Sequence, residues 1–182
     1  MDRIHTLAGT GLVILILLSM TACKSTVPRQ DPTGKVFPSV EGTSLKDERY
    51  KIPEDFAGSP VLLLIGFKMD TQFDIDRWLL ALQQARVKVR FYELPTIPGM
   101  VPRMFSGYID DGMRSGIPVE DWGGVITIYG DASKIVDFTG NETSLPARVV
   151  LLDTEGRVVF FHDRGYSVGT LERLQKALRE LS

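Results

Sequence analysis

The sequence predicts an α/β fold in which a mixed β-sheet is flanked by helices and carries an inserted αβ unit. The first indication is residues 60–67 (PVLLLIGF), an unbroken apolar run typical of a central strand that is covered on both faces. The second is the order of the elements, because a strand–helix–strand unit precedes an apolar hairpin and a final helix. A parallel unit followed by an antiparallel hairpin makes a mixed sheet with helices on both faces.

The hairpin lies within residues 145–166. Two apolar runs, residues 149–152 and 158–161, flank a turn that ends in Gly156, where a positive φ is needed. Pro146 stands at the entrance of the first run, and an X-Pro bond in that place can be cis. We therefore expect two buried antiparallel strands.

A helix follows the 60–67 run, and its apolar residues recur at helical spacing along one stripe. Asp70 or Thr71 can cap this helix, and the helix dipole favours Asp74 near its first turn. Residues 87–92 alternate in polarity and predict the next strand, which ends before Pro95. The stripe consists of Ile75, Trp78, Leu79, Leu82 and Ala85.

The inserted unit begins near Pro102, a residue that suits the first turn of a helix. Apolar residues at helical spacing predict a helix whose stripe faces the core, and residues 125–129 predict the strand that follows. Between them, Trp122 is either an exposed anchor for a partner or a cover for one end of the sheet. The stripe consists of Val101, Met104, Phe105, Tyr108, Ile109 and Met113.

Two more helices complete the expected domain. Residues 132–138 predict a short helix that ends at Gly140. The last helix carries an apolar face opposite a charged face. Its apolar face consists of Leu171, Leu174, Leu178 and Leu181.

Residues 1–22 have the pattern of a lipoprotein signal peptide. Arg3 supplies positive charge, and the apolar run of residues 12–18 is too short to span a membrane. The letters SMTAC, which end at Cys23, resemble a bacterial lipobox, and this implies diacylglycerol and palmitate on Cys23. Lys24 stands where a retention signal would have Asp, which points to the outer membrane, facing the periplasm. The alternative is an ordinary signal peptide with a free cysteine nearby.

The chain is thus divided into a signal peptide (1–22), a lipidated tether (23–35) and one domain (36–182). The tether is polar and contains Pro28 and Pro32, as flexible or extended linkers do. Of the 182 residues, 43% are hydrophobic, which is sufficient for a core. The net charge of −2 argues against nucleic acid as a partner, since phosphate neutralisation needs a basic surface.

The order of elements over residues 36–182 resembles that of thioredoxin-like proteins with an inserted αβ unit, such as peroxiredoxins. In redox-active members a Cys-x-x-Cys pair stands at the N-terminus of the first helix, where the helix dipole lowers the thiolate pKa. Thr71 and Asp74 correspond to those positions. Because the only cysteine is Cys23, dithiol exchange, thiol peroxidase chemistry and a Cys-x-x-x-Cys copper-carrier site are excluded for the domain.

No cofactor, metal site or catalytic residue is expected. His162 has no accompanying nucleophile, which favours a hydrogen-bonded histidine at a strand end over a general base. Asp70, Asp74 and Asp76 fit no calcium loop, and we expect them to cap the helix or to be solvated. Copper(I) held by methionines is a weaker alternative, because Met104 already belongs to the expected core stripe.

Three short stretches, residues 102–104, 125–130 and 153–157, look like parts of the mitochondrial ATP-synthase assembly factors and their bacterial relatives. Those proteins are thioredoxin-like, lack the redox cysteines and help a membrane complex to assemble. A lipid anchor departs from that family, so the resemblance does not identify a client.

The resemblance to thioredoxin-like proteins implies a redox-inactive envelope lipoprotein that binds a protein or peptide. In this fold the backbone before the proline pairs with an extended peptide, which assigns the groove to Thr71, Gln72, Leu145 and Pro146. One alternative is a small-ligand-binding protein or non-thiol enzyme that uses the same groove, with Lys68 near an anion. The other is a structural spacer.

Overall fold

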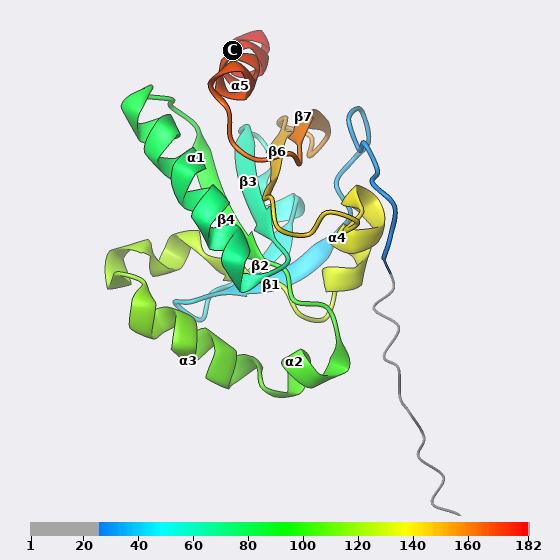
Figure 1. Cartoon of the computed structure of the whole chain (residues 1–182), viewed down its shortest axis with the longest axis vertical. Helices are drawn as coiled ribbons and strands as arrows, with labels where there is room; N and C mark the ends of the chain where they lie inside the picture. The colour runs from blue at the N-terminus through cyan, green and yellow to red at the C-terminus, as the bar shows by residue number, and fades with distance from the viewer. Residues whose placement is uncertain (1–25, 182) are drawn as a thin grey trace, which may run out of the picture.

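Strand β3 (Val61–Gly66) lies at the centre of a four-stranded sheet in the computed structural model, which describes residues 26–181 (Figure 1). It runs parallel to β4 (Arg90–Pro95) and antiparallel to β6 (Arg148–Leu152). Strand β6 pairs in turn with β7 (Val158–His162). Every residue of β3 and β6 is buried, as their unbroken apolar runs predict. The parallel unit and the antiparallel hairpin are therefore both confirmed.

A second sheet has the order β2-β1-β5. It consists of β1 (Val40–Ser44), β2 (Arg49–Ile52) and β5 (Ile126–Thr127). Parallel bridges, one of them between Glu93 and Val125, join β5 to the edge of β4, so the inserted unit extends the main sheet. The sequence pattern predicts β5 but not the β1–β2 hairpin.

Helices cover both faces of the main sheet (Figure 1). On one face α1 (Gln72–Gln84) and α5 (Val168–Glu180) bury their apolar stripes, including Trp78 and Leu174. On the other face α4 (Ala132–Thr139) packs on a separate cluster of apolar side chains. The helical spacing in the sequence predicts the buried faces of α1 and α5, and it predicts α4 as a helix without assigning its face. Among residues 26–181, no helix is long and apolar enough to cross a membrane.

The single helix expected after Pro102 is instead two helices, α2 (Met100–Met104) and α3 (Ser106–Gly116). Neither contains a buried residue, and Met104 is 73% exposed. The prediction that this stripe faces the core is therefore wrong. The spacing shows that the apolar residues share a helix face, but spacing alone does not determine which way that face points.

Residues 26–35 pack against the domain, although the sequence suggests a tether over 23–35. The Val27 N–H donates to Asn141 Oδ1 over 2.8 Å, and Arg29 forms an ion pair of 2.7 Å with buried Asp163. This segment lies along α4 (Figure 1). The packed part of the chain therefore begins before the expected boundary. The expectations for the signal peptide and for the lipid on Cys23 lie outside the described residues.

Gly42 in β1 provides a test of the packing between the β1–β2 hairpin and β5. A Cβ at this position would lie 2.6 Å from Ile126 Cγ2 and would also overlap Ile128. We expect Gly42→Ala to lower the free energy of unfolding by about 1–3 kcal/mol, because the methyl group overpacks the core. Urea denaturation measures this value. Gly169→Ala on α5, where a Cβ meets nothing within 4 Å, is the matched control and should be neutral or slightly stabilising.

Candidate functional site

The loop from β3 into α1 occupies the place where the resemblance to thioredoxin-like proteins puts a redox pair. A short 3₁₀ turn, Met69–Thr71, leads directly into α1. Thr71 is only 1% exposed, and its Oγ1 donates to the Ser144 carbonyl over 3.4 Å. This bond brings the start of α1 beside the segment before Pro146, as expected. Because Thr71 is buried, it supports the groove rather than contacting a ligand.

Asp74 corresponds to the second position of that pair, and it is buried rather than solvated. Its carboxylate is 8% exposed and accepts two backbone hydrogen bonds. Oδ2 accepts from the Ala147 N–H over 3.0 Å, and Oδ1 accepts from the Tyr166 N–H over 2.9 Å. Asp74 therefore joins α1 to the entrance of β6 and to the loop before α5. The expectation of a solvated or capping role is wrong for this residue.

Gln72 lies on the other side of α1, facing β4. Its side-chain nitrogen donates to Asp76 Oδ1 over 2.9 Å and to Glu93 Oε2 over 3.2 Å. Burial raises the pKa of Glu93, and the hydrogen bond from Gln72 partly offsets this rise. The side chain of Gln72 is thus engaged away from Leu145 and Pro146. Of the four expected groove residues, the structure therefore brings together Thr71, Leu145 and Pro146, but not the side chain of Gln72.

The Leu145–Pro146 bond is trans, since the cis bond within residues 26–181 is Ile52–Pro53. Leu145 is 50% exposed. Its backbone N–H and C=O form no hydrogen bond with any other part of the described chain. These groups are therefore available for pairing with an extended ligand.

Buried Arg148 holds the segment before β6 through hydrogen bonds to two backbone carbonyls. Its guanidinium donates to the Pro146 carbonyl over 2.8 Å and to the Gly140 carbonyl over 3.1 Å. It also lies over the ring of Phe67, 4.8 Å from the centroid. Burial lowers the pKa of Arg148. Nothing in the sequence pattern marks this arginine, which stands at the start of an apolar strand.

A shallow hollow of about 450 Å³ lies where these elements meet. We call it the α1 hollow, and its walls include Phe73, Arg77, Leu145, Pro146 and Gly165. Phe73 is 69% exposed, so a large apolar ring stands free beside it. The sequence shows Phe73 only as a residue off the apolar stripe of α1. An open, partly apolar surface of this kind suits a flexible chain better than an enclosed small molecule.

The chemistry of the site is limited by its side chains. The sequence contains one cysteine, Cys23, which lies outside the described residues. Over residues 26–181 no group of three His, Cys, Asp or Glu side chains is placed to hold a metal ion. His162 contacts the Gly165 carbonyl through Nε2 over 2.7 Å, which agrees with a hydrogen-bonded histidine at a strand end. Trp122 is half-buried and donates to the Ile117 carbonyl, so its ring is not a free anchor.

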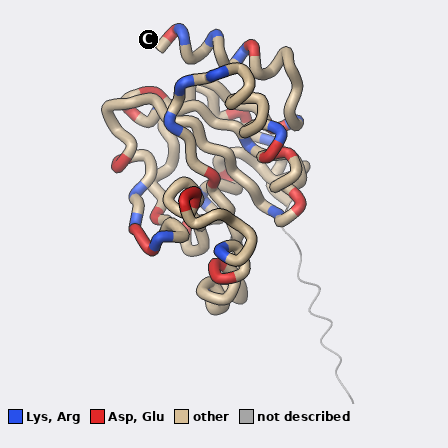
Figure 2. Tube along the Cα trace, turned by 90° about the vertical axis from the view of Figure 1, so that its left-hand side faces the viewer, with Lys and Arg blue, Asp and Glu red and all other residues tan. Residues whose placement is uncertain are grey.

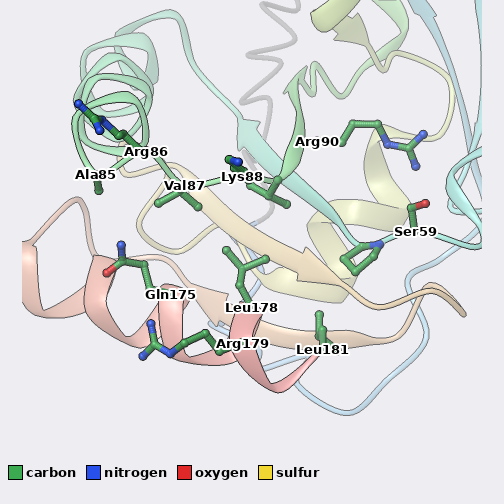
Figure 3. A pocket seen from close by; sticks show the side chains of 12 residues that line it. Ser59, Ala85, Arg86, Val87, Lys88, Arg90, Gln175, Leu178, Arg179 and Leu181 are labelled. Carbon is green, nitrogen blue, oxygen red and sulfur yellow. The ribbon is translucent and has the colours of Figure 1, made fainter.

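A second, larger hollow of about 560 Å³ lies at the opposite end of α1, beside α5. Figure 3 shows Leu178 of α5 and Leu181, which directly follows this helix, on one side of the hollow and Val87 on the other. Several Lys and Arg segments lie next to the C-terminal helix in Figure 2. We call this site the basic hollow, and its cations are Arg86, Lys88, Arg90 and Arg179. Among the described residues, none of these four forms an ion pair.

Comparison with solved structures relates this architecture to known folds. The chain is similar to a SCO1/SenC family lipoprotein from Bacillus anthracis, with a TM-score of 0.55 and 11% identity over 83% of this chain and 98% of that one. It is similar to a thiol peroxidase from Chromobacterium violaceum, with a TM-score of 0.55 and 12% identity over 87% of this chain and 93% of the peroxidase chain. It also resembles BsSco, a member of the Sco family of cytochrome c oxidase assembly proteins. The TM-score is 0.53, with 11% identity over 82% of this chain and 95% of the BsSco chain.

These likenesses establish the thioredoxin-like α/β fold that the sequence predicts. At such low identity they show the fold alone. No protein-family model and no curated protein matches the sequence.

The two hydrogen bonds to Asp74 give a direct test of its structural role. Asp74→Asn replaces one acceptor oxygen by a donor, which leaves a buried N–H without a partner. We expect the free energy of unfolding in urea to fall by about 1–3 kcal/mol. Asp76→Asn, on the exposed side of the same helix, should change it by less than about 0.5 kcal/mol. Equal effects of the two substitutions would contradict the role assigned to Asp74.

Proposed function

We propose that this chain is a redox-inactive, thioredoxin-like binding protein of the bacterial envelope that captures an extended segment of a protein or peptide in the α1 hollow. The observation that carries the proposal is Leu145, a residue that is 50% exposed and whose backbone has no hydrogen-bond partner within the described chain. An extended peptide would pair with this backbone by β-augmentation, and such main-chain bonds require no thiol.

The surroundings of Leu145 favour capture of an apolar segment. The ring of Phe73 stands exposed beside the hollow and offers an aromatic anchor, a type of residue enriched at binding hot spots. Arg148 and Asp74 both hold the peptide group that follows Pro146, Arg148 through the Pro146 carbonyl and Asp74 through the Ala147 N–H. A rigid surface of this kind lowers the entropic cost of binding.

The envelope location rests on the sequence around Cys23, which resembles a lipobox and lies outside the described residues. Similarity in fold to a SCO1/SenC family lipoprotein is compatible with a lipid-anchored protein of this fold. We further propose that the lipid lies in the outer membrane and that the domain faces the periplasm. A role in the assembly of a membrane complex agrees with the description of BsSco and with the short resemblance to ATP-synthase assembly factors.

In-cell photo-crosslinking tests the capture of a peptide. A photo-reactive residue at position 73 should yield a specific protein adduct, while the same residue at position 176 on α5, exposed and distant from the α1 hollow, should not. Leu145→Pro removes the backbone N–H and should reduce the adduct several-fold, whereas Leu145→Met keeps the N–H and should retain it. Melting temperatures of both variants control for folding.

Two results would contradict this proposal. Absence of any adduct specific to position 73 would exclude capture in the α1 hollow. A full yield of adduct from folded Leu145→Pro protein would exclude backbone pairing at Leu145.

The basic hollow supports a second candidate function, which is binding of a small anionic amphiphile. Four cations without ion pairs in the described chain surround an apolar floor that includes Val87 and Leu181. Such a site complements a molecule that joins an anionic head to a hydrocarbon tail. The expected small-ligand alternative is therefore better supported here than in the α1 hollow.

Thermal unfolding with decyl phosphate, kept below its micelle concentration, tests this candidate. We expect the midpoint to rise by a few degrees for the native chain, because a ligand that binds only the folded state stabilises it. The shift should vanish when Arg86, Lys88 and Arg179 are all replaced by Ser, and it should persist in Lys176→Ser. An equal shift in the triple variant would exclude the basic hollow as the site.

A further inference from the structure

The segment formed by α2 and α3 turns its apolar side chains outward. Their spacing of three and four residues places them on one face of the two helices. Each is more than half exposed, and Tyr108 reaches 83%. We call this face the α2–α3 apolar surface, and it consists of Met100, Val101, Met104, Phe105 and Tyr108. Contiguous apolar surface of this kind marks an interaction site in soluble domains.

The contacts that hold α3 to the domain are polar. Asp110 Oδ1 accepts from the Tyr129 hydroxyl over 2.8 Å. Arg114 donates to the Leu45 carbonyl and to Asp47 Oδ1, each over 2.8 Å. In α3, Asp110 and Arg114 thus lie half-buried against the protein, while Tyr108 points toward solvent. The outward face lacks an apolar partner within residues 26–181.

The start of the described chain lies near this surface. An ideal Cβ at Gly130 would lie 3.9 Å from the Arg103 guanidinium, which places α2 beside the entrance of α4. At the other end of α4, Val27 hydrogen-bonds to Asn141. A helix of this length rises about 12 Å, so α2 and the start of the described chain flank one short helix. Figure 1 shows α2 and α3 at the end of the molecule opposite α5.

The sequence leaves little chain between the domain and Cys23. Only Lys24 and Ser25 separate Cys23 from Thr26, the first described residue. Three residues span about 11 Å at most. An acyl group on Cys23 would therefore hold the bilayer surface within reach of α2. A tether as long as the sequence suggests, from 23 to 35, would not impose this closeness.

The charges of the two helices also suit a lipid surface. The only charged residue of α2 is the cation Arg103, and Asp131, the acid that interacts with it, is itself paired with Lys134 over 3.0 Å. In α3, Asp111 is paired with Arg114 over 2.8 Å. Met, Val and Phe side chains bury readily at the boundary of headgroups and acyl chains, and Tyr108 has the amphipathic ring that membrane interfaces favour.

We propose that the α2–α3 apolar surface docks into the interface of the bilayer that holds the lipid on Cys23. The proposal rests on the lipid anchor of the proposed function and goes beyond it, because it assigns a second contact and an orientation to the domain. The helix α5 and the basic hollow then face away from the membrane. The acyl chains alone suffice to anchor the protein, and the apolar surface adds a contact that sets the orientation of the domain.

Fluorescence of the full lipoprotein in phosphatidylcholine vesicles tests the docking. A Met104→Cys variant is labelled with an environment-sensitive dye, since Cys23 is acylated and the domain has no other thiol. We expect the emission to shift to the blue on reconstitution and doxyl-labelled lipids to quench it several-fold. Tyr108→Cys should behave alike, and Arg179→Cys beside the basic hollow should show neither effect.

Vesicle flotation, recorded on the same samples, separates the possible failures. Protein that floats while the label at position 104 keeps its aqueous emission would overturn the docking and leave the anchor intact. Protein that does not float would overturn the anchor and the docking together, while the crosslinking from position 73 still decides peptide capture. A blue shift that grows with protein concentration in the absence of vesicles would assign the surface to a second copy of the chain and overturn the proposal.

Discussion

The fold around the α1 hollow depends on one buried carboxylate. Burial of a carboxylate is costly unless hydrogen bonds replace its water, and two backbone N–H groups do this for Asp74. Its two partners, the N–H groups of Ala147 and Tyr166, lie 73 and 92 residues further along the chain. Both bonds form only when α1, the entrance of β6 and the loop before α5 come together. Trp78, one turn along the helix, packs edge-on to Tyr166 at 5.4 Å and adds apolar area to the same junction.

This junction explains how a thioredoxin-like fold can keep a groove without thiols. The position that the resemblance assigns to the second cysteine holds the buried carboxylate of Asp74, and the position that it assigns to the first holds buried Thr71. Arg148 supports the same segment from the other side through the Pro146 carbonyl. Polar groups therefore preserve the shape of the site where reactive groups are absent. What the α1 hollow offers is the unpaired backbone of Leu145 and apolar surface.

Much of this fold could be predicted because burial on one or both faces of an element produces a regular pattern of apolar residues in the sequence. Strands β3 and β6 are covered on both faces, so both faces must be apolar, and an unbroken run results. The stripes of α1 and α5 have the helical period for the same reason. No sequence pattern indicates the buried role of Asp74, because an acidic residue in the first turn of a helix is also favoured by the helix dipole. The packing of residues 26–35 could not be predicted from the sequence either, because much of it consists of backbone hydrogen bonds, which do not depend on side-chain type.

The segment α2–α3 shows the limit of periodicity most clearly. Its apolar residues recur at helical spacing, as those of α1 do, yet α1 buries most of its stripe whereas α2 and α3 contain no buried residue. In α1 the apolar stripe meets the sheet, whereas in α3 Asp110 and Arg114 make the contacts with the domain. A hydrophobic face is stable in water only when something covers it. Where the rest of the described chain does not cover such a face, the periodic pattern of the helix indicates a surface that contacts a membrane or another molecule.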